Sequence, residues 1–143
     1  GVELDEARAV ELYRAAAEQG LPRAQCCLGY CTEKGIGTEA DPAAAAEWYR
    51  RSAEGGYSRG MYNYACCFEN GTGVKKDLPL AQQWYERAAK EGLPDAMYEL
   101  GVWYEDGRCG PKDAAQALAW YKKAAEAGHD RARKAVERME KLV

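Results

Sequence analysis

The amino-acid sequence repeats with a fixed period of 36 residues, and this period constrains the fold more than any other feature. Tyr13, Tyr49, Tyr85 and Tyr121 are each 36 residues apart, a match at four registers that is not chance. A fixed period of roughly 20 to 50 residues is the mark of repeat proteins, in which each unit packs only against its neighbours. We therefore predict a single domain built from like units. Other sets with the same step are Ala9, Ala45, Ala81 and Ala117, then Trp48, Trp84 and Trp120, and Gly20, Gly56, Gly92 and Gly128.

Each unit reads as a pair of helices. Apolar and small residues fall at helical spacing twice, with a glycine break between the two stretches. The composition also favours helices. The chain has 26 alanines, the best helix former, but only 1 isoleucine, 6 valines and 3 threonines, which favour strands. Asp41, Asp77 and Asp113 precede the tryptophan-bearing helices as N-caps, and Gly56 and Gly92 end them. We predict helices at about 5–19, 22–34, 41–55, 58–70, 78–91, 94–106, 113–127 and 130–142.

The segments AEWYRRSAEGG, AQQWYERAAKEG and AMYELGVWYEDG, with the turn GTGVKKD, resemble Sel1-like repeats, which are relatives of tetratricopeptide repeats. The resemblance implies a right-handed α-solenoid of antiparallel helix hairpins, with about four repeats and about eight helices, that serves as a protein-interaction scaffold. The sequence departs from the family pattern at two places. Thr32 and Phe68 occupy the repeat position at which Tyr104 fits the pattern, and Cys109 replaces the second glycine of the turn. The expected single domain, 1–143, comprises a half-repeat 1–20, hairpins at about 21–56, 57–92 and 93–128, and a capping helix 129–143.

The recurring aromatic residues are assigned to packing. Tyr49, Tyr85 and Tyr121 recur with Trp84 and Trp120, and core residues recur because every repeat packs alike. We expect Trp84 to be a core residue whose replacement by alanine leaves a cavity.

The six cysteines are expected to be reduced, packed thiols. Some secreted cysteine-rich relatives join the two helices of a repeat by a disulfide across the hairpin turn, but the matching places here hold Ala17 with Gln25 and Ala53 with Met61. Cytosolic proteins keep such thiols reduced. A cytoplasmic location is favoured, with a periplasmic or secreted one left open. The cysteines are Cys26, Cys27, Cys31, Cys66, Cys67 and Cys109.

The sequence predicts no enzyme, no cofactor and no metal site. His129 is the only histidine, so a four-ligand metal site would need thiolates for nearly everything. It stands at a turn, and we expect it to be solvated. The turns GIGTEAD and GTGVKKD follow no strand and lack the Gly-Lys-Ser/Thr of a phosphate loop. Only His129 could serve a serine or cysteine nucleophile as its base.

Charge and hydropathy point to a protein partner. The net charge is −3 and the charged residues are scattered, which argues against nucleic acid. No run approaches the ~18–20 apolar residues of a membrane span, so membrane insertion is not expected. Residues 5–19 are expected to be the second helix of a repeat without its first helix. Leu12 and Tyr13 then form an apolar edge that meets either an upstream part of a longer protein or a second copy.

The candidate site is a groove along the first helix of each pair. By resemblance to tetratricopeptide hairpins, the face opposite Leu28, Tyr64 and Leu100 lines a concave groove, and its residues differ between repeats. Tyr62 and Tyr98 are the expected central anchors for a peptide or helix of a partner. One alternative is a structural spacer in a longer solenoid, and another is a redox or metal sensor using Cys27, Cys31, Cys66 and Cys67. The expected groove residues are Arg23, Cys26, Tyr30, Arg59, Tyr62, Asn63, Cys66, Glu69, Asp95, Tyr98, Glu99 and Val102.

Overall fold

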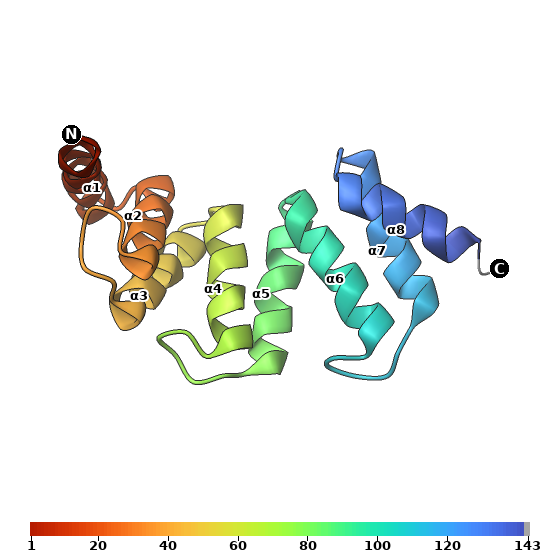
Figure 1. Ribbon diagram of the computed structural model, residues 1–143. Coiled ribbons are helices and arrows are strands. Elements are labelled where there is room, and N and C mark those ends of the chain that lie inside the picture. Colours follow the sequence, from red (N-terminus) through yellow and green to blue (C-terminus); the bar gives the residue numbers. More distant parts are fainter. Residues whose placement is uncertain (142–143) are drawn as a thin grey trace. The chain divides into compact units, whose positions relative to one another are not determined.

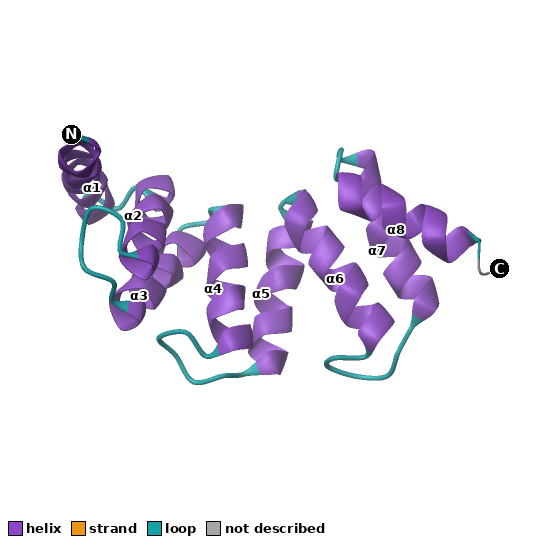
Figure 2. Ribbon diagram, viewed as in Figure 1, coloured by secondary structure: helices purple, strands orange, loops and turns teal. Residues whose placement is uncertain are grey.

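The computed structural model describes residues 1–141, which form eight α-helices joined by turns and loops and contain no strand (Figures 1 and 2). The predicted ranges agree closely, although the first helix begins at Val2 rather than near residue 5. Position 142, the predicted end of the last helix, lies outside the described residues. The helices are α1 (Val2–Glu18), α2 (Pro22–Lys34), α3 (Pro42–Glu54), α4 (Ser58–Asn70), α5 (Leu78–Lys90), α6 (Pro94–Asp106), α7 (Ala114–Glu126) and α8 (Asp130–Glu140).

Aspartates begin three of these helices, as predicted. The side chains of Asp41, Asp77 and Asp113 each accept the backbone N–H of the residue three positions later, at 3.1 Å. Each carboxylate thus satisfies one of the amides that lack a partner in the first helical turn. Gly56 and Gly92 lie just beyond the ends of α3 and α5 with φ of 92°, which confirms their role in ending the tryptophan-bearing helices.

The chain divides into two compact units, with the boundary inside α5. The N-terminal unit, Gly1–Ala81, packs α2 against α1, α3 and α4, and α3 against α4. The C-terminal unit, from Gln82 on, packs α7 against α6 and α8. Hairpins of consecutive helices therefore build both units, while the repeat boundaries expected from the sequence stay a prediction. Among residues 1–141, none of the helices combines the length and apolar character that crossing a bilayer requires.

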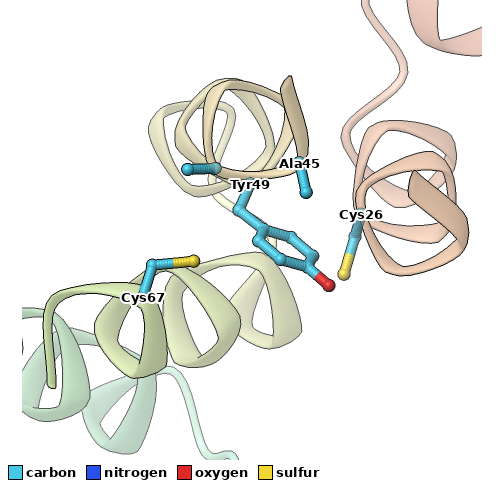
Figure 3. Packing of buried hydrophobic residues seen from close by; sticks show 5 residues of the cluster. Cys26, Ala45, Tyr49 and Cys67 are labelled. Carbon is cyan, nitrogen blue, oxygen red and sulfur yellow. The ribbon is translucent and has the colours of Figure 1, made fainter. Parts of the chain in front are cut away.

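A tyrosine occupies the centre of the packing in each unit, as predicted. The Tyr49 ring is 1% exposed and lies between Cys26 and Cys67 in the N-terminal unit (Figure 3). Tyr121, also 1% exposed, has the same place in the C-terminal unit. A Cβ at Gly29 would lie 2.8 Å from the Tyr49 ring. The recurring glycine is thus needed for close approach of the tyrosine-bearing helix.

Trp84 and Trp120 are not fully buried core residues, which corrects the sequence-based expectation for these two positions. Trp84 and Trp120 are both partly exposed, and a cationic side chain lies over each ring. The Arg87 guanidinium carbon lies 4.4 Å from the Trp84 ring centroid, and Lys123 Nζ lies 4.7 Å from that of Trp120. Each tryptophan directly precedes a core tyrosine, so a rotation of about 100° around the helix turns it off the buried stripe. It covers the edge of the core and binds a cation instead.

Candidate functional site

The N-terminal unit contains a hollow along α2 and α4, which we call the α2–α4 hollow. It consists of two pockets of about 350 and 250 Å³, and Tyr30 and Asn63 line both of them. Tyr30 is 50% exposed, so much of its ring faces solvent between the two pockets. Arg59 lines the larger pocket and Cys66 lines the smaller one. Cys26 also lines the larger pocket, so five of the predicted groove residues are brought together here.

Two tyrosines of the larger pocket were not predicted. Tyr13 of α1 and Tyr57, the residue before α4, line it together with Tyr30. Tyr57 occupies a turn position where the other repeats have Leu21, Leu93 or His129. This difference between repeats could have identified Tyr57 as a candidate site residue. A residue that differs at equivalent positions of the repeats is not there for packing that all repeats share.

The other predicted residues of the N-terminal unit lie near the hollow without lining its two pockets. Arg23 is exposed and lines a separate pocket beside α1. Tyr62 and Glu69 are partly buried on α4. The Arg59 guanidinium carbon lies 5.2 Å from the Tyr62 ring centroid, so a cation–π contact fixes this arginine beside the hollow.

Cys26, one of the predicted groove residues, lines the larger pocket but is almost fully buried. The residue is 5% exposed, packs against Tyr49 and reaches the larger pocket only at its wall. The Asn63 side-chain amide donates to its sulfur at 3.4 Å. The face of α2 that carries Cys26 is covered because α3 and α4 both pack against α2. Such contacts between helices cannot be predicted from the residue pattern of one helix.

The four predicted residues of α6 belong to the C-terminal unit. Tyr98 and Val102 are partly buried against the cluster around Tyr121, which includes Met139 of α8. Asp95 Oδ1 lies 3.1 Å from a ring nitrogen of a histidine described below, and Glu99 is partly buried. These four side chains therefore lie on the predicted helix. Because α8 packs nearby, they are less exposed than Tyr30.

His129 is not a solvated turn residue, contrary to the prediction. Its side chain is only 9% exposed, and its ring stacks on Tyr98 with centroids 4.7 Å apart and planes 14° apart. Nδ1 accepts the Ala132 backbone N–H at 3.1 Å, and Nε2 lies 3.1 Å from Asp95 Oδ1. His129 therefore caps α8 and joins it to α6, which is a structural role.

Glutamates on α2 and α6 hold the core tyrosines in place. Tyr49 donates its hydroxyl hydrogen to Glu33 Oε1 at 2.8 Å, and Tyr121 donates to Glu105 Oε1 at 2.7 Å. Glu105 also accepts two bonds from Arg138, which are the main reason why its pKa is lowered. The sequence has a glutamate 16 residues before Tyr49, Tyr85 and Tyr121, and this spacing could have identified the pairs.

The buried thiols of Cys26 and Cys67 are poorly suited to chemistry. None of the six cysteines, all of which lie in the described part, forms a disulfide. Burial raises the pKa of Cys26 and of Cys67 to about 12, because a thiolate would lose its hydration there. Within residues 1–141, no three histidine, cysteine, aspartate or glutamate side chains gather in a way that could hold a metal ion.

We predict a graded thiol reactivity in the folded protein. At pH 8, iodoacetamide should alkylate the partly exposed Cys27 at least ~10-fold faster than its buried neighbour Cys26, because the thiolate is the reacting species. Mass-spectrometric mapping of timed samples measures both rates in one experiment. The same pKa shift makes the folded state less stable as pH rises from about 9 to about 12, since the unfolded chain ionises first. Equal rates for the two cysteines would contradict the burial of Cys26.

Comparison with known proteins places the repeats in a family. A model described as Sel1 repeat matches residues 1–21, 22–57, 58–93 and 94–129. No curated protein matches the chain.

Three similar solved structures have the same architecture. A Sel1 repeat protein from Oxalobacter formigenes is 39% identical with a TM-score of 0.85 over 91% of this chain and 52% of its own. The protein c5321, a protective antigen of uropathogenic Escherichia coli, is 34% identical with a TM-score of 0.84 over 93% of this chain and 28% of its own. Helicobacter pylori cysteine-rich protein B is 25% identical with a TM-score of 0.73 over 94% of this chain and 97% of its own. The chain thus spans about a quarter and about half of the two more similar structures.

Proposed function

This chain belongs to the Sel1 repeat family, and from that premise we propose that it is a non-catalytic scaffold that binds a peptide or a helix of a partner protein in the α2–α4 hollow. Sel1 repeats generally serve as protein–protein interaction scaffolds. The repeat fold leaves one face of α2 and α4 available, and the hollow on that face gives a partner segment a defined place.

The exposure of Tyr30 is the observation that carries this proposal. Its side chain is half exposed between two pockets, so a partner can cover a large aromatic surface without any rearrangement of the core. Tyrosine combines large contact area with a hydrogen-bonding hydroxyl at low entropic cost, which is why it is frequent in binding surfaces. Tyr62 remains a proposed anchor at the edge of the hollow.

Polar groups around Tyr30 suit the main chain of a peptide. Asn63 offers an amide at the centre of the hollow, Arg59 a cation at the larger pocket, and Glu33 a carboxylate at the smaller one. The arginine and the glutamate lie in different pockets, so they favour one direction of a bound segment. Tyr98 is proposed to contribute less, because its ring already stacks on His129.

The alternatives have less support. Burial raises the pKa of Cys31 and of Cys67, two of the four cysteines of the sensor alternative, which disfavours a redox or metal sensor. A pure spacer would need no half-exposed tyrosine between pockets. The edge formed by Leu12 and Tyr13, 72% and 37% exposed, remains a proposed place for self-association.

The test uses peptides selected from a random displayed library against the intact protein. We expect Tyr30→Ala to weaken the binding of a selected peptide by about 30-fold or more, because buried aromatic anchors cost ~2 kcal/mol or more when truncated. Tyr62→Ala is expected to act in the same direction. Titration calorimetry gives the affinities, and the melting temperature of each variant should stay near that of the wild type because Tyr30 lies outside the core.

Leu12→Ala is the matched control, since it removes an exposed apolar side chain on α1 that lines neither pocket of the hollow. It should leave the affinity unchanged. The proposal fails if the selected peptides bind both tyrosine variants as tightly as the wild type. A library that yields no saturable ligand would instead favour the spacer.

A further inference from the structure

The third repeat departs from the others at two positions that line one pocket. Trp103 stands where the two preceding repeats have cysteine, and Cys109 stands where their turns have glycine. Both line a pocket of about 220 Å³ in the C-terminal unit, whose other walls include Gln82, Asp113 and Gln116. This pocket is separate from the α2–α4 hollow, and common packing of the repeats does not account for it.

The indole of Trp103 presents a buried donor without an acceptor. The residue is 2% exposed, and its ring meets Tyr85 edge to face with centroids 5.7 Å apart. Within residues 1–141, its Nε1–H has no hydrogen-bond acceptor, and it is the one buried side-chain nitrogen or oxygen in this state. Buried polar groups are nearly always paired, so an orphaned donor beside a pocket points to a group that enters and accepts.

The walls of the pocket select the charge of that group. Asp113 supplies a carboxylate, which is fixed because Oδ1 accepts the backbone N–H of Gln116 at 3.1 Å. The residues that line the pocket include no lysine, arginine or histidine. The Arg108 guanidinium carbon lies 5.8 Å from the Trp103 ring centroid, but Arg108 is not part of the lining and pairs with Asp106 at 3.6 Å. Within the lining, the Asp113 carboxylate repels an anion, while Trp103 offers a hydrogen to an acceptor. A neutral group that both accepts and donates satisfies the two walls together, and a primary amide is such a group.

The size of the pocket limits the occupant to about one side chain. Drug-sized ligands and cofactors occupy about 300–1,000 Å³, and one water takes only about 30 Å³ of liquid volume. The volume of about 220 Å³ lies between the two. The glutamines at positions 82 and 116 add amide edges that can pair with a second amide.

We propose that this pocket receives the side-chain amide of a glutamine or asparagine from a partner protein. The amide oxygen accepts the Nε1–H of Trp103, and the amide nitrogen donates to the Asp113 carboxylate. The inference does not depend on the α2–α4 hollow, because all the residues that carry it lie in the C-terminal unit.

The test follows the four indole N–H signals of the ¹⁵N-labelled intact protein by NMR. The probe is N-acetylglutamine methylamide, and the matched probes with glutamate or methionine side chains keep the size but replace the amide. We expect the Trp103 signal to move downfield and to saturate with the glutamine probe only. The signals of Trp48, Trp84 and Trp120 should stay in place and serve as internal controls.

Two variants secure the assignment and the role of the carboxylate. The Trp103 signal is the one missing from Trp103→Phe. If that variant does not fold, Trp48→Phe, Trp84→Phe and Trp120→Phe identify it by elimination. Asp113→Asn keeps an N-cap on α7 and should weaken binding of the glutamine probe about 10-fold. The proposal is overturned if the Trp103 signal does not move, if it moves equally with all three probes, or if Asp113→Asn has no effect.

Discussion

Replacing Tyr121 by alanine is expected to lower the free energy of unfolding by about 3–5 kcal/mol, whereas replacing the adjacent Trp120 by alanine should cost only about 1 kcal/mol. Tyr121 is 1% exposed, and its removal leaves a cavity among Ala117, Ala135 and Met139. Trp120 is larger but partly exposed, and Lys123 Nζ lies 4.7 Å from its ring centroid. The two variants therefore show whether the loss of stability follows the burial of a side chain or its size.

Urea denaturation followed by circular dichroism measures both losses in the intact chain. Tyr121→Phe is a useful third variant, because it keeps the ring and removes only the hydrogen bond to Glu105. It should cost about 1 kcal/mol, since Arg138 still pairs with the glutamate. A loss for Trp120→Ala as large as that for Tyr121→Ala would mean that the tryptophan, not the tyrosine, fills the core.

The helices and the core tyrosines could be predicted because they depend on local spacing that the repeat shows several times. Asp41 and Asp113 begin helices for reasons contained within four consecutive residues. Tyr49 and Tyr121 recur because each must fill the same space against a glycine of the preceding helix. Such features follow from periodicity alone.

The candidate site was harder to predict because it depends on contacts between helices. Cys26 lies on the predicted groove face of α2, yet α3 and α4 cover most of it. His129 looks like a turn residue until α8 packs beside α6 and brings it to Asp95 and Tyr98. Tyr30 and Asn63 come together only because neighbouring repeats stack, and the sequence gives no distance between them.

The turn glycines provide the second large effect, because one of them is required by a backbone contact and another is not. Gly73 has a φ of 72°, and a Cβ there would overlap the carbonyl oxygen of Pro42 at the start of α3. Gly56 has a φ of 92°, but a Cβ there would meet no atom within 4 Å. Alanine at either position pays about 1–2 kcal/mol for the left-handed conformation, and only Gly73→Ala also forces the backbone apart.

We therefore expect Gly73→Ala to lower the free energy of unfolding by about 3 kcal/mol or more, and Gly56→Ala by about 1–2 kcal/mol. Urea denaturation of both variants gives the difference, and equal losses would show that the turn can move away from α3 at little cost. The third turn supports the argument, because Cys109 replaces the equivalent glycine and no non-glycine residue in the described part has a positive φ. The turn that carries Cys109 has therefore changed its backbone, and it is the turn that lines the pocket of Trp103.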